Sequence, residues 1–137
     1  MGRVLAVDPG TVRVGLAVSD PLGISAQPLE VVAAAGAVER IADLCHELAV
    51  DEIIVGLPTT ETGDEGASAR IARNLAAELS ERTGLPVTAV DERYTTRMAD
   101  SMMVEAGVKR RRRRGTVDKV AAAVLLRGYL DRPGEER

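Results

Sequence analysis

Four acidic residues stand where a folded chain could bring carboxylates together. Asp8 ends the first apolar run, Asp91 and Glu92 follow the last short apolar run, and Asp118 precedes an alanine- and leucine-rich stretch. Carboxylates that gather on one patch repel one another unless cations are bound there. Mg²⁺ prefers carboxylate oxygens and keeps open positions for substrate oxygens. Two such ions roughly 4 Å apart would activate a water and stabilise the leaving oxygen of a phosphodiester.

Each acid also has a structural explanation. Asp8 could cap its own turn, the pair Asp91-Glu92 could be a solvated strand exit, and Asp118 could favour the dipole of a helix that it opens. Taken together in one domain, however, the acids fit a cation site. Strand alternation lets only one of Asp91 and Glu92 face that site. We favour Glu92, whose arm is longer, so the expected metal ligands are Asp8, Glu92 and Asp118, with Mg²⁺ or Mn²⁺ as the ion.

The elements that must position these acids follow from apolar spacing and from glycine and proline. Strands are expected over 3–8, 13–19, 24–32, 52–56 and 87–90, and helices over 37–49, 67–83, 96–106 and 117–130. Residues 59–66 are expected to form a loop. This order predicts one α/β domain, 1–137, with a mixed five-stranded sheet: three antiparallel strands, then parallel strands joined by helices. Ligands of such sheets bind near the carboxyl ends of parallel strands, where three of the acids fall.

Charge is distributed unevenly along the 137 residues. The net charge is −3, yet residues 109–114 are six consecutive cations, so an acidic body carries one basic segment, expected here as a loop. This segment lies close to Asp118 in the sequence and would attract a polyanion. Tyr94 and Tyr129 are the only aromatic residues, so nucleic acid would be held mainly through its phosphates. The candidate substrate contacts are Gly10, Thr11, Arg13, Arg93, Lys109, Arg110, Arg111 and Arg112.

Composition also limits the class of protein. The lone Cys45 cannot form an internal disulfide, and its apolar neighbours at helical spacing predict packing inside a helix layer. His46 is expected at the surface of the same helix rather than as a general base. No apolar run is long enough to span a bilayer, and the first residues enter a strand at once. We therefore expect a cytoplasmic protein that has no membrane partner.

Four segments together carry a resemblance to a known family. They are 7–20 (VDPGTVRVGLAVSD), 54–58 (IVGLP), 91–96 (DERYTT) and 117–122 (VDKVAA), and they occur in the order and rough spacing of the YqgF/RuvX family. The resemblance covers essentially the whole chain. It implies an RNase H-like fold, kinship with RuvC-type Holliday junction resolvases, and a nuclease that matures the 5′ end of pre-16S ribosomal RNA. It also implies that Asp8, the pair Asp91-Glu92 and Asp118 are catalytic.

Three other functions stay open from the sequence alone. A resolvase on the same fold would cut branched DNA and would act as a homodimer, whereas the ribosomal RNA enzyme could be a monomer. The segment 8–15 also resembles the phosphate-binding hairpin of actin-like and sugar-kinase ATPases, which need two such domains around the nucleotide. Finally, the fold could bind ribosomal or transcription components without cleaving anything.

Overall fold

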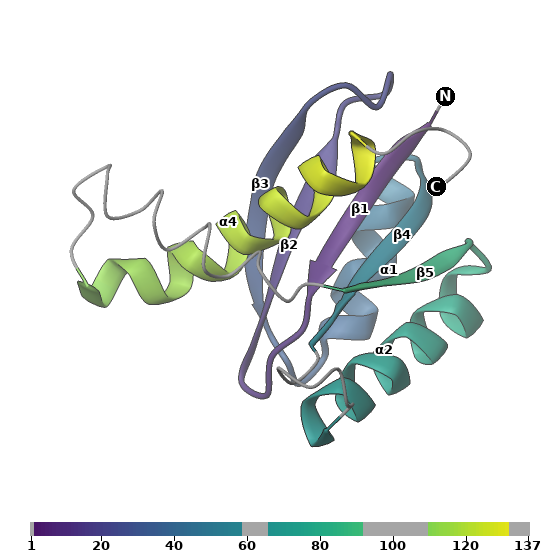
Figure 1. The fold of residues 1–137 in the computed structure, drawn as a ribbon. Helices are drawn as coiled ribbons and strands as arrows, with labels where there is room; N and C mark the ends of the chain where they lie inside the picture. The colour runs from purple at the N-terminus through teal and green to yellow at the C-terminus, as the bar shows by residue number, and fades with distance from the viewer. Residues whose placement is uncertain (1, 59–65, 92–109, 132–137) are drawn as a thin grey trace.

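The computed structural model describes residues 2–58, 66–91 and 110–131, and within this part it describes the side chains of all but 110–118. The strands form a single sheet in the order β3-β2-β1-β4-β5 (Figure 1). The elements along the chain are β1 (Arg3–Asp8), β2 (Arg13–Ser19), β3 (Ala26–Ala33), α1 (Ala37–Glu47), β4 (Val50–Leu57), α2 (Ala67–Thr83), β5 (Val87–Asp91) and α4 (Arg110–Leu130).

The sheet has the mixed topology that the sequence predicted. β2 pairs antiparallel with both β1 and β3, while β4 pairs parallel with both β1 and β5. The three parallel strands β1, β4 and β5 therefore end at the same edge of the sheet, at Asp8, Leu57 and Asp91. The strand that carries Asp8 is the central one of the five.

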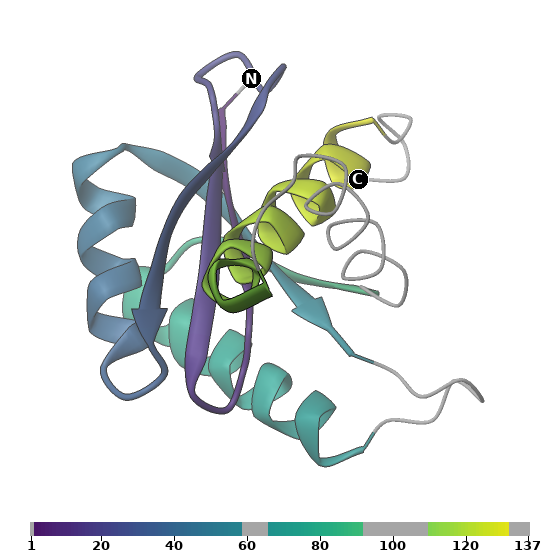
Figure 2. The same ribbon diagram turned by 90° about the vertical axis from the view of Figure 1, so that its left-hand side faces the viewer.

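The two faces of the sheet are covered by different helices. Along β1, Leu5 and Val7 pack into one core cluster with residues of α1 and α2, while Val4 and Ala6 pack into a second cluster with α4. This division follows from the pleat, which points successive side chains to opposite faces. Figure 2 shows α1 and α2 on one side of the sheet and α4 on the other. The sheet is thus the middle of three layers.

Turns between the strands are closed by specific hydrogen bonds. At the β2–β3 turn, the Asp20 carboxylate accepts hydrogen bonds from the backbone N–H groups of Ile24 and Ser25, at 2.6 and 3.1 Å. These bonds lower the pKa of Asp20 below its ordinary value, because they favour the charged form. The Gly23 N–H also donates to the Asp20 carbonyl, and Gly23 has a positive φ of 71°, a conformation that suits glycine.

One expectation about the last helix is wrong. Residues 110–116 were expected to be loop, but α4 begins at Arg110 and includes them. Arginine is among the better helix-forming residues, so a run of arginines continues a helix readily. Asp118 consequently lies about two turns inside α4 rather than at its start. The helix-dipole explanation for Asp118 is therefore wrong, because that effect is confined to the first turn.

Other expectations about single elements have mixed outcomes. β3 begins at Ala26 rather than 24, α1 ends at Glu47 rather than 49, and β4 runs from Val50 to Leu57 rather than over 52–56. The helix over 67–83 is confirmed. The helix expected over 96–106 and most of the loop expected over 59–66 lie outside the described residues.

The interior position expected for Cys45 is confirmed. Its side chain is buried in the cluster between the sheet and α1, and this burial raises the pKa of the thiol to about 11, so that it stays protonated at neutral pH. His46 is exposed, as expected. None of the helices in the described part of the chain combines the length and the apolar character that crossing a bilayer requires.

Candidate active site

Asp8 is the last residue of the central strand and lies on the face that α4 covers. Residues two and four positions earlier, Ala6 and Val4, pack into the cluster with α4, and strand alternation assigns Asp8 to the same face. Its side chain is half-buried, and it engages in a polar interaction of its own. A carboxylate is therefore held at the edge of a rigid sheet, between bulk solvent and an apolar layer.

Two glycines flank Asp8 on this face of the sheet. Gly15 of β2 is the direct partner of Asp8 in the antiparallel ladder. On the other side, Val7 is in register with Val55, which brings Gly56 of β4 beside Asp8. Neither neighbouring strand therefore places a side chain beside the Asp8 carboxylate. Glycine inside a strand often marks a close approach by a ligand or another backbone.

Gly56 ends the strand expected over 52–56, at the edge of the sheet where ligands bind, and the structure adds that it lies beside Asp8. Its role depends on register: nothing local distinguishes a glycine that lies beside an acid on the next strand from one that merely ends a strand. The available signal was the position of Gly56 at the carboxyl end of a parallel strand, the edge where ligands bind.

Asp91 and Asp8 lie on opposite faces of the sheet. Val90 packs into the cluster on the α4 side and Val87 packs against the cluster on the other side, so alternation assigns Asp91 to the α1–α2 face. β4 also lies between the two strands, which separates them by about 10 Å. Asp91 is exposed and engages in an interaction of its own. Glu92 and Arg93 lie outside the described residues.

Asp118 belongs to the helix that covers the Asp8 face. Farther along α4, the side chains buried against the sheet recur at three- and four-residue spacing; they are Ala121, Ala122, Leu125, Leu126 and Tyr129. Position 118 precedes Ala122 by one turn and so belongs to the same stripe of the helix. α4 contacts β1, β2 and β3. Positions 8 and 118 therefore lie on one side of the sheet, although the Asp118 side chain is outside the described part.

The carboxyl-terminal half of α4 is anchored to the sheet by polar contacts as well as by burial. The Tyr129 hydroxyl donates a hydrogen bond to a carboxylate oxygen of Glu52 on β4, at 2.9 Å. The Arg127 guanidinium donates to the backbone carbonyl of Ile24, in the β2–β3 turn, at 2.9 Å. Tyr129 is itself only 3% exposed. These contacts fix how α4 lies on the sheet, and hence where its earlier turns lie.

We expect Tyr129→Phe to lower the free energy of unfolding by about 1 kcal/mol, because it removes a hydrogen bond to a charged acceptor and leaves the ring in place. Urea denaturation followed by circular dichroism measures this change. The variant Glu52→Gln keeps an acceptor oxygen and should lose less. If the double variant Tyr129→Phe/Glu52→Ala has the same free energy of unfolding as Glu52→Ala alone, the hydroxyl acts through Glu52. A loss from Tyr129→Phe that persists without Glu52 would contradict this pairing.

The hairpin after Asp8 carries three predicted substrate contacts. Thr11 and Arg13 are exposed at its tip, as a phosphate contact requires. The backbone leaves room only for glycine at position 10, because a Cβ atom on Gly10 would collide with the Arg13 carbonyl oxygen. The hairpin is tied to the end of β3 by a hydrogen bond of 2.9 Å from the Ala34 N–H to the Val12 carbonyl. The loop next to Asp8 is therefore held in one conformation.

The other predicted substrate contacts are cations. Arg110, Arg111 and Arg112 lie in the first turn of α4, where the structure describes the backbone alone. Lys109 lies outside the described residues. In Figure 1 this first part of α4 projects beyond β3, away from the body of the sheet. A basic helical segment thus extends from the layer that covers Asp8.

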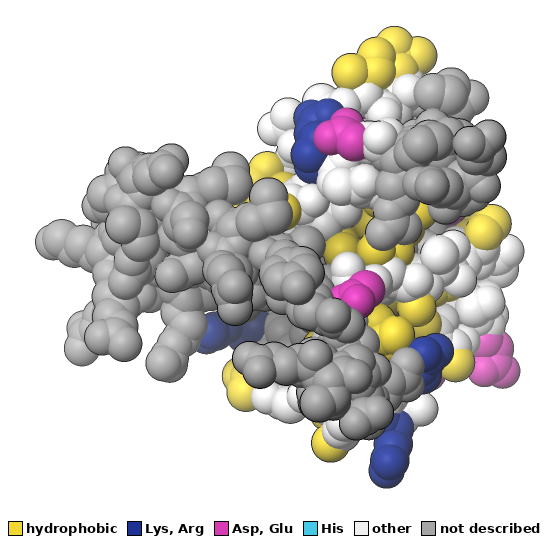
Figure 3. All heavy atoms as spheres, in the orientation of Figure 1, with side chains coloured by type: hydrophobic (Ala, Val, Ile, Leu, Met, Phe, Trp, Pro, Cys, Tyr) yellow, Lys and Arg dark blue, Asp and Glu magenta, His cyan; other side chains and the backbone are white. Residues whose placement is uncertain are grey.

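A complete ligand set for a metal ion is not formed by the described residues alone. Within the described ranges, no group of three or more His, Cys, Asp or Glu side chains could hold an ion. On the face that Figure 3 shows, the described acidic side chains accordingly stand singly. Asp8 nevertheless fits such a role, since it presents a carboxylate at the edge of the sheet and hard cations prefer carboxylate oxygens.

The fold defines the class of protein to which the chain belongs. It matches a structure of Thermus thermophilus RuvC in complex with a Holliday junction substrate, with a TM-score of 0.59 and 22% sequence identity over 91% of this chain and 92% of that one. A second structure of RuvC from this organism matches with a TM-score of 0.56. The fold is thus RNase H-like, as the sequence predicted.

The family is shown by closer relatives. The family model described as "RuvX: Holliday junction resolvase" matches residues 2–132, and the chain therefore belongs to the RuvX family. A relative from Pelotomaculum thermopropionicum is 41% identical, over 98% of this chain and 90% of its own length. One from Mycobacteroides abscessus is 45% identical, over 95% of this chain and 81% of its own length. Both relatives bear the name "Putative pre-16S rRNA nuclease".

Proposed function

We propose that this protein is a nuclease that depends on a divalent metal and trims the 5′ end of pre-16S ribosomal RNA in the cytoplasm. The observation that carries the proposal is the position of Asp8: it ends the central strand of an RNase H-like sheet, half-buried between two glycines. Membership of the RuvX family supports action on nucleic acid, and the names of its relatives support RNA as the substrate.

Asp8, Glu92 and Asp118 are the residues that would hold the metal, Mg²⁺ or Mn²⁺. For Glu92 the support is its place in the sequence: it directly follows Asp91, where β5 ends at the same edge of the sheet as Asp8. For Asp118 the support is its place on the stripe of α4 that carries Ala122. Asp118 lies too far inside the helix for the helix dipole to stabilise its charge.

The chain's own groups have distinct tasks in this reaction. When bound, a divalent ion lowers the pKa of a water and neutralises charge on the leaving oxygen. Asp8 holds its carboxylate at a fixed point of the sheet edge, so that the place where it would help to hold the ion is set before substrate binds. Gly15 and Gly56 keep the adjacent strands clear, so that the sugar-phosphate backbone can approach. Thr11 and Arg13 offer a hydroxyl and a cation to neighbouring phosphates.

The basic segment 109–114 would supply most of the affinity for the polyanion. Six cations in sequence displace counterions from phosphates, whatever the base sequence. Because Arg110–Arg114 are helical, their charges are distributed around a rod that projects from the body, and a folded RNA could lie against it. Arg93, next to Glu92, would pair with a phosphate at the site itself.

Replacing Arg110, Arg111 and Arg112 by Gln should weaken binding of a single-stranded RNA and lower the slope of log K against log salt concentration by about 2, since each phosphate contact contributes about 0.7. Fluorescence anisotropy over a salt series measures this slope. The exposed α2 residues Arg70 and Arg73, changed to Gln together, serve as the control and should leave the slope nearly unchanged. An unaltered slope in the triple variant would mean that the segment does not bind phosphates.

Incubation with pre-16S ribosomal RNA that carries an extended 5′ end, in Mg²⁺ or Mn²⁺, tests the function directly. A four-way DNA junction forms the parallel arm, because the family description names Holliday junctions. We expect cleavage of the RNA, loss of cleavage in EDTA, and little action on the junction. Symmetric cutting of the junction with intact RNA would instead assign the protein to DNA recombination, and a homodimer would then be expected.

A further inference from the structure

A groove between α1 and α2 lies on the face of the sheet opposite to α4 and Asp8. Three hollows follow one another along it, of about 220, 360 and 570 Å³. The first two share the lining residues Val38 and Glu78, and the second and third share Arg82, so the hollows adjoin one another along α1 and α2. α1 alone, at 11 residues, gives the groove a length of about 16 Å.

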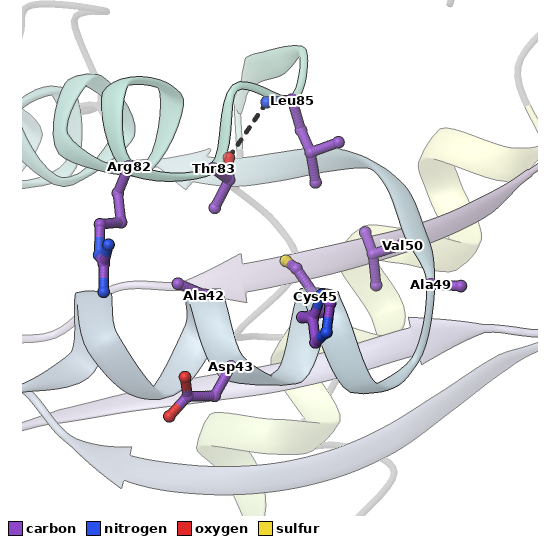
Figure 4. Close-up of a pocket in the computed structure, with 9 residues that line it drawn as sticks. Ala42, Asp43, Cys45, Ala49, Val50, Arg82, Thr83 and Leu85 are labelled. Carbon is purple, nitrogen blue, oxygen red and sulfur yellow. Dashed lines mark hydrogen bonds between the residues drawn. The ribbon is translucent and has the colours of Figure 1, made fainter.

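The groove is mainly apolar at its two ends, while in the middle hollow Val38 lies among charged side chains. At the end near the β1–β2 hairpin it is lined by Val14, Ala34, Ala37, Val38, Ile71 and Leu75. At the other end Ala42, Cys45, Val50 and Leu85 line it, and Figure 4 shows the Cys45 sulfur on the α2 side of α1. Ile71 remains 41% exposed although it adjoins this apolar floor. A protein surface that leaves an apolar strip open in this way often binds a partner.

The rim of the groove is acidic. Asp43 on α1, and Glu78 and Glu81 on α2, line the hollows with exposed carboxylates. Arg82 is the cation among the lining residues. Its guanidinium forms a bidentate ion pair with the Glu39 carboxylate of α1, with N–O distances of 2.7 and 3.2 Å. Glu39 and Asp43 accordingly raise the pKa of Arg82. The charge left for a ligand is therefore negative.

We propose that this groove binds an amphipathic segment of another protein, apolar on one side and rich in lysine or arginine on the other. A helix of about 12 residues spans about 18 Å, which matches the groove. Its apolar side would cover the exposed floor around Ile71, and its cations would meet the carboxylates of Asp43, Glu78 and Glu81.

Two other occupants fit the groove less well. Nucleic acid would be repelled by the rim, since phosphates and carboxylates carry the same charge. The cationic segment 109–114 of a second copy of this chain could pair with the rim, but its six positions hold no apolar residue to cover the floor. Both the charge and the floor therefore favour a partner that is amphipathic.

A synthetic helix of about 12 residues, built from leucine and lysine at helical spacing, serves as the probe, and a scrambled peptide of the same composition serves as its control. We expect the patterned peptide to bind the full chain at least tenfold more tightly than the scrambled one. The amide NMR signals that shift should belong to α1 and α2. Glu78→Lys with Glu81→Lys should weaken binding about tenfold, and Ile71→Ala about threefold.

Glu47→Lys is the matched control, because Glu47 lies on α1 and is exposed but does not line the hollows. Equal weakening by Glu47→Lys and by the α2 pair would overturn the proposal, as would equal binding of the two peptides or shifts confined to α4. Sedimentation of the chain alone forms the last arm. Self-association that the α2 pair abolishes would assign the groove to a second copy and would also overturn the proposal. None of these measurements depends on nuclease activity, so they test the groove separately from the proposed function.

Discussion

Asp8→Asn is expected to lower the rate of metal-dependent RNA cleavage by about 10²-fold or more while leaving the fold intact. Asparagine has nearly the same shape, so the half-buried position at the end of β1 can accommodate it. It lacks the negative charge that holds a divalent cation, and even residues that only support metal ligands cost 10- to 100-fold when lost. Single-turnover cleavage in Mn²⁺, with thermal unfolding as the check on folding, measures the effect.

Asp43→Asn is the matched control for this variant. It removes an exposed carboxylate from α1, on the opposite face of the sheet, and should leave cleavage within about twofold of the parent, because surface charges far from the site act weakly. If Asp8→Asn cleaved the RNA as fast as Asp43→Asn, the metal site would have to lie elsewhere in the molecule.

Convergence of positions 8 and 118 can be measured by non-additivity. Residues that act on one bound ion lose their effect together, so Asp8→Asn/Asp118→Asn should be no slower than the worse single variant. Glu92→Gln should behave in the same way when it is added to Asp8→Asn. Independent, multiplying losses in the double variants would mean that these acids belong to separate sites, and the proposed ligand set would then be abandoned.

Ile54→Ala is expected to lower the free energy of unfolding by about 2–5 kcal/mol, since it opens a cavity in a fully buried position of a central strand. A domain of this size is stable by about 5–15 kcal/mol, so the loss is a large fraction of the total. Urea denaturation measures it. Ile71→Ala, at a position that is 41% exposed, is the control and should cost less than about 1 kcal/mol.

The neighbouring Ile53 makes this prediction more specific. Ile54 packs into the cluster under α4, whereas Ile53 packs into the cluster under α1 and α2. Amide hydrogen exchange should therefore quicken in α4 for Ile54→Ala and in α1 and α2 for Ile53→Ala, because each cavity weakens the layer that it faces. The same exchange pattern in both variants would contradict the division of the core into two clusters.

Much of the fold could be predicted because its causes are local. The alternation of apolar residues, the turn residues around Gly10 and Gly23, and the spacing in 67–83 are properties of neighbouring residues. They gave the correct order of the strands and helices that the structure describes, and the correct mixed sheet. The main error concerned Arg110–Arg114, where the high charge suggested a solvated loop and the helix propensity of arginine prevailed.

From the sequence alone came the candidate acids, the strand ends that carry them and the family resemblance, since residue type and spacing are enough for each. Only the tertiary structure decided which residues share a face. Register placed Gly15 and Gly56 beside Asp8, the pleat assigned Asp91 to the opposite face, and the packing of α1 on α2 formed a groove with an acidic rim. These relations join residues far apart in the chain, and their physical cause is the pairing of strands and the burial of apolar faces, which no short stretch of sequence contains.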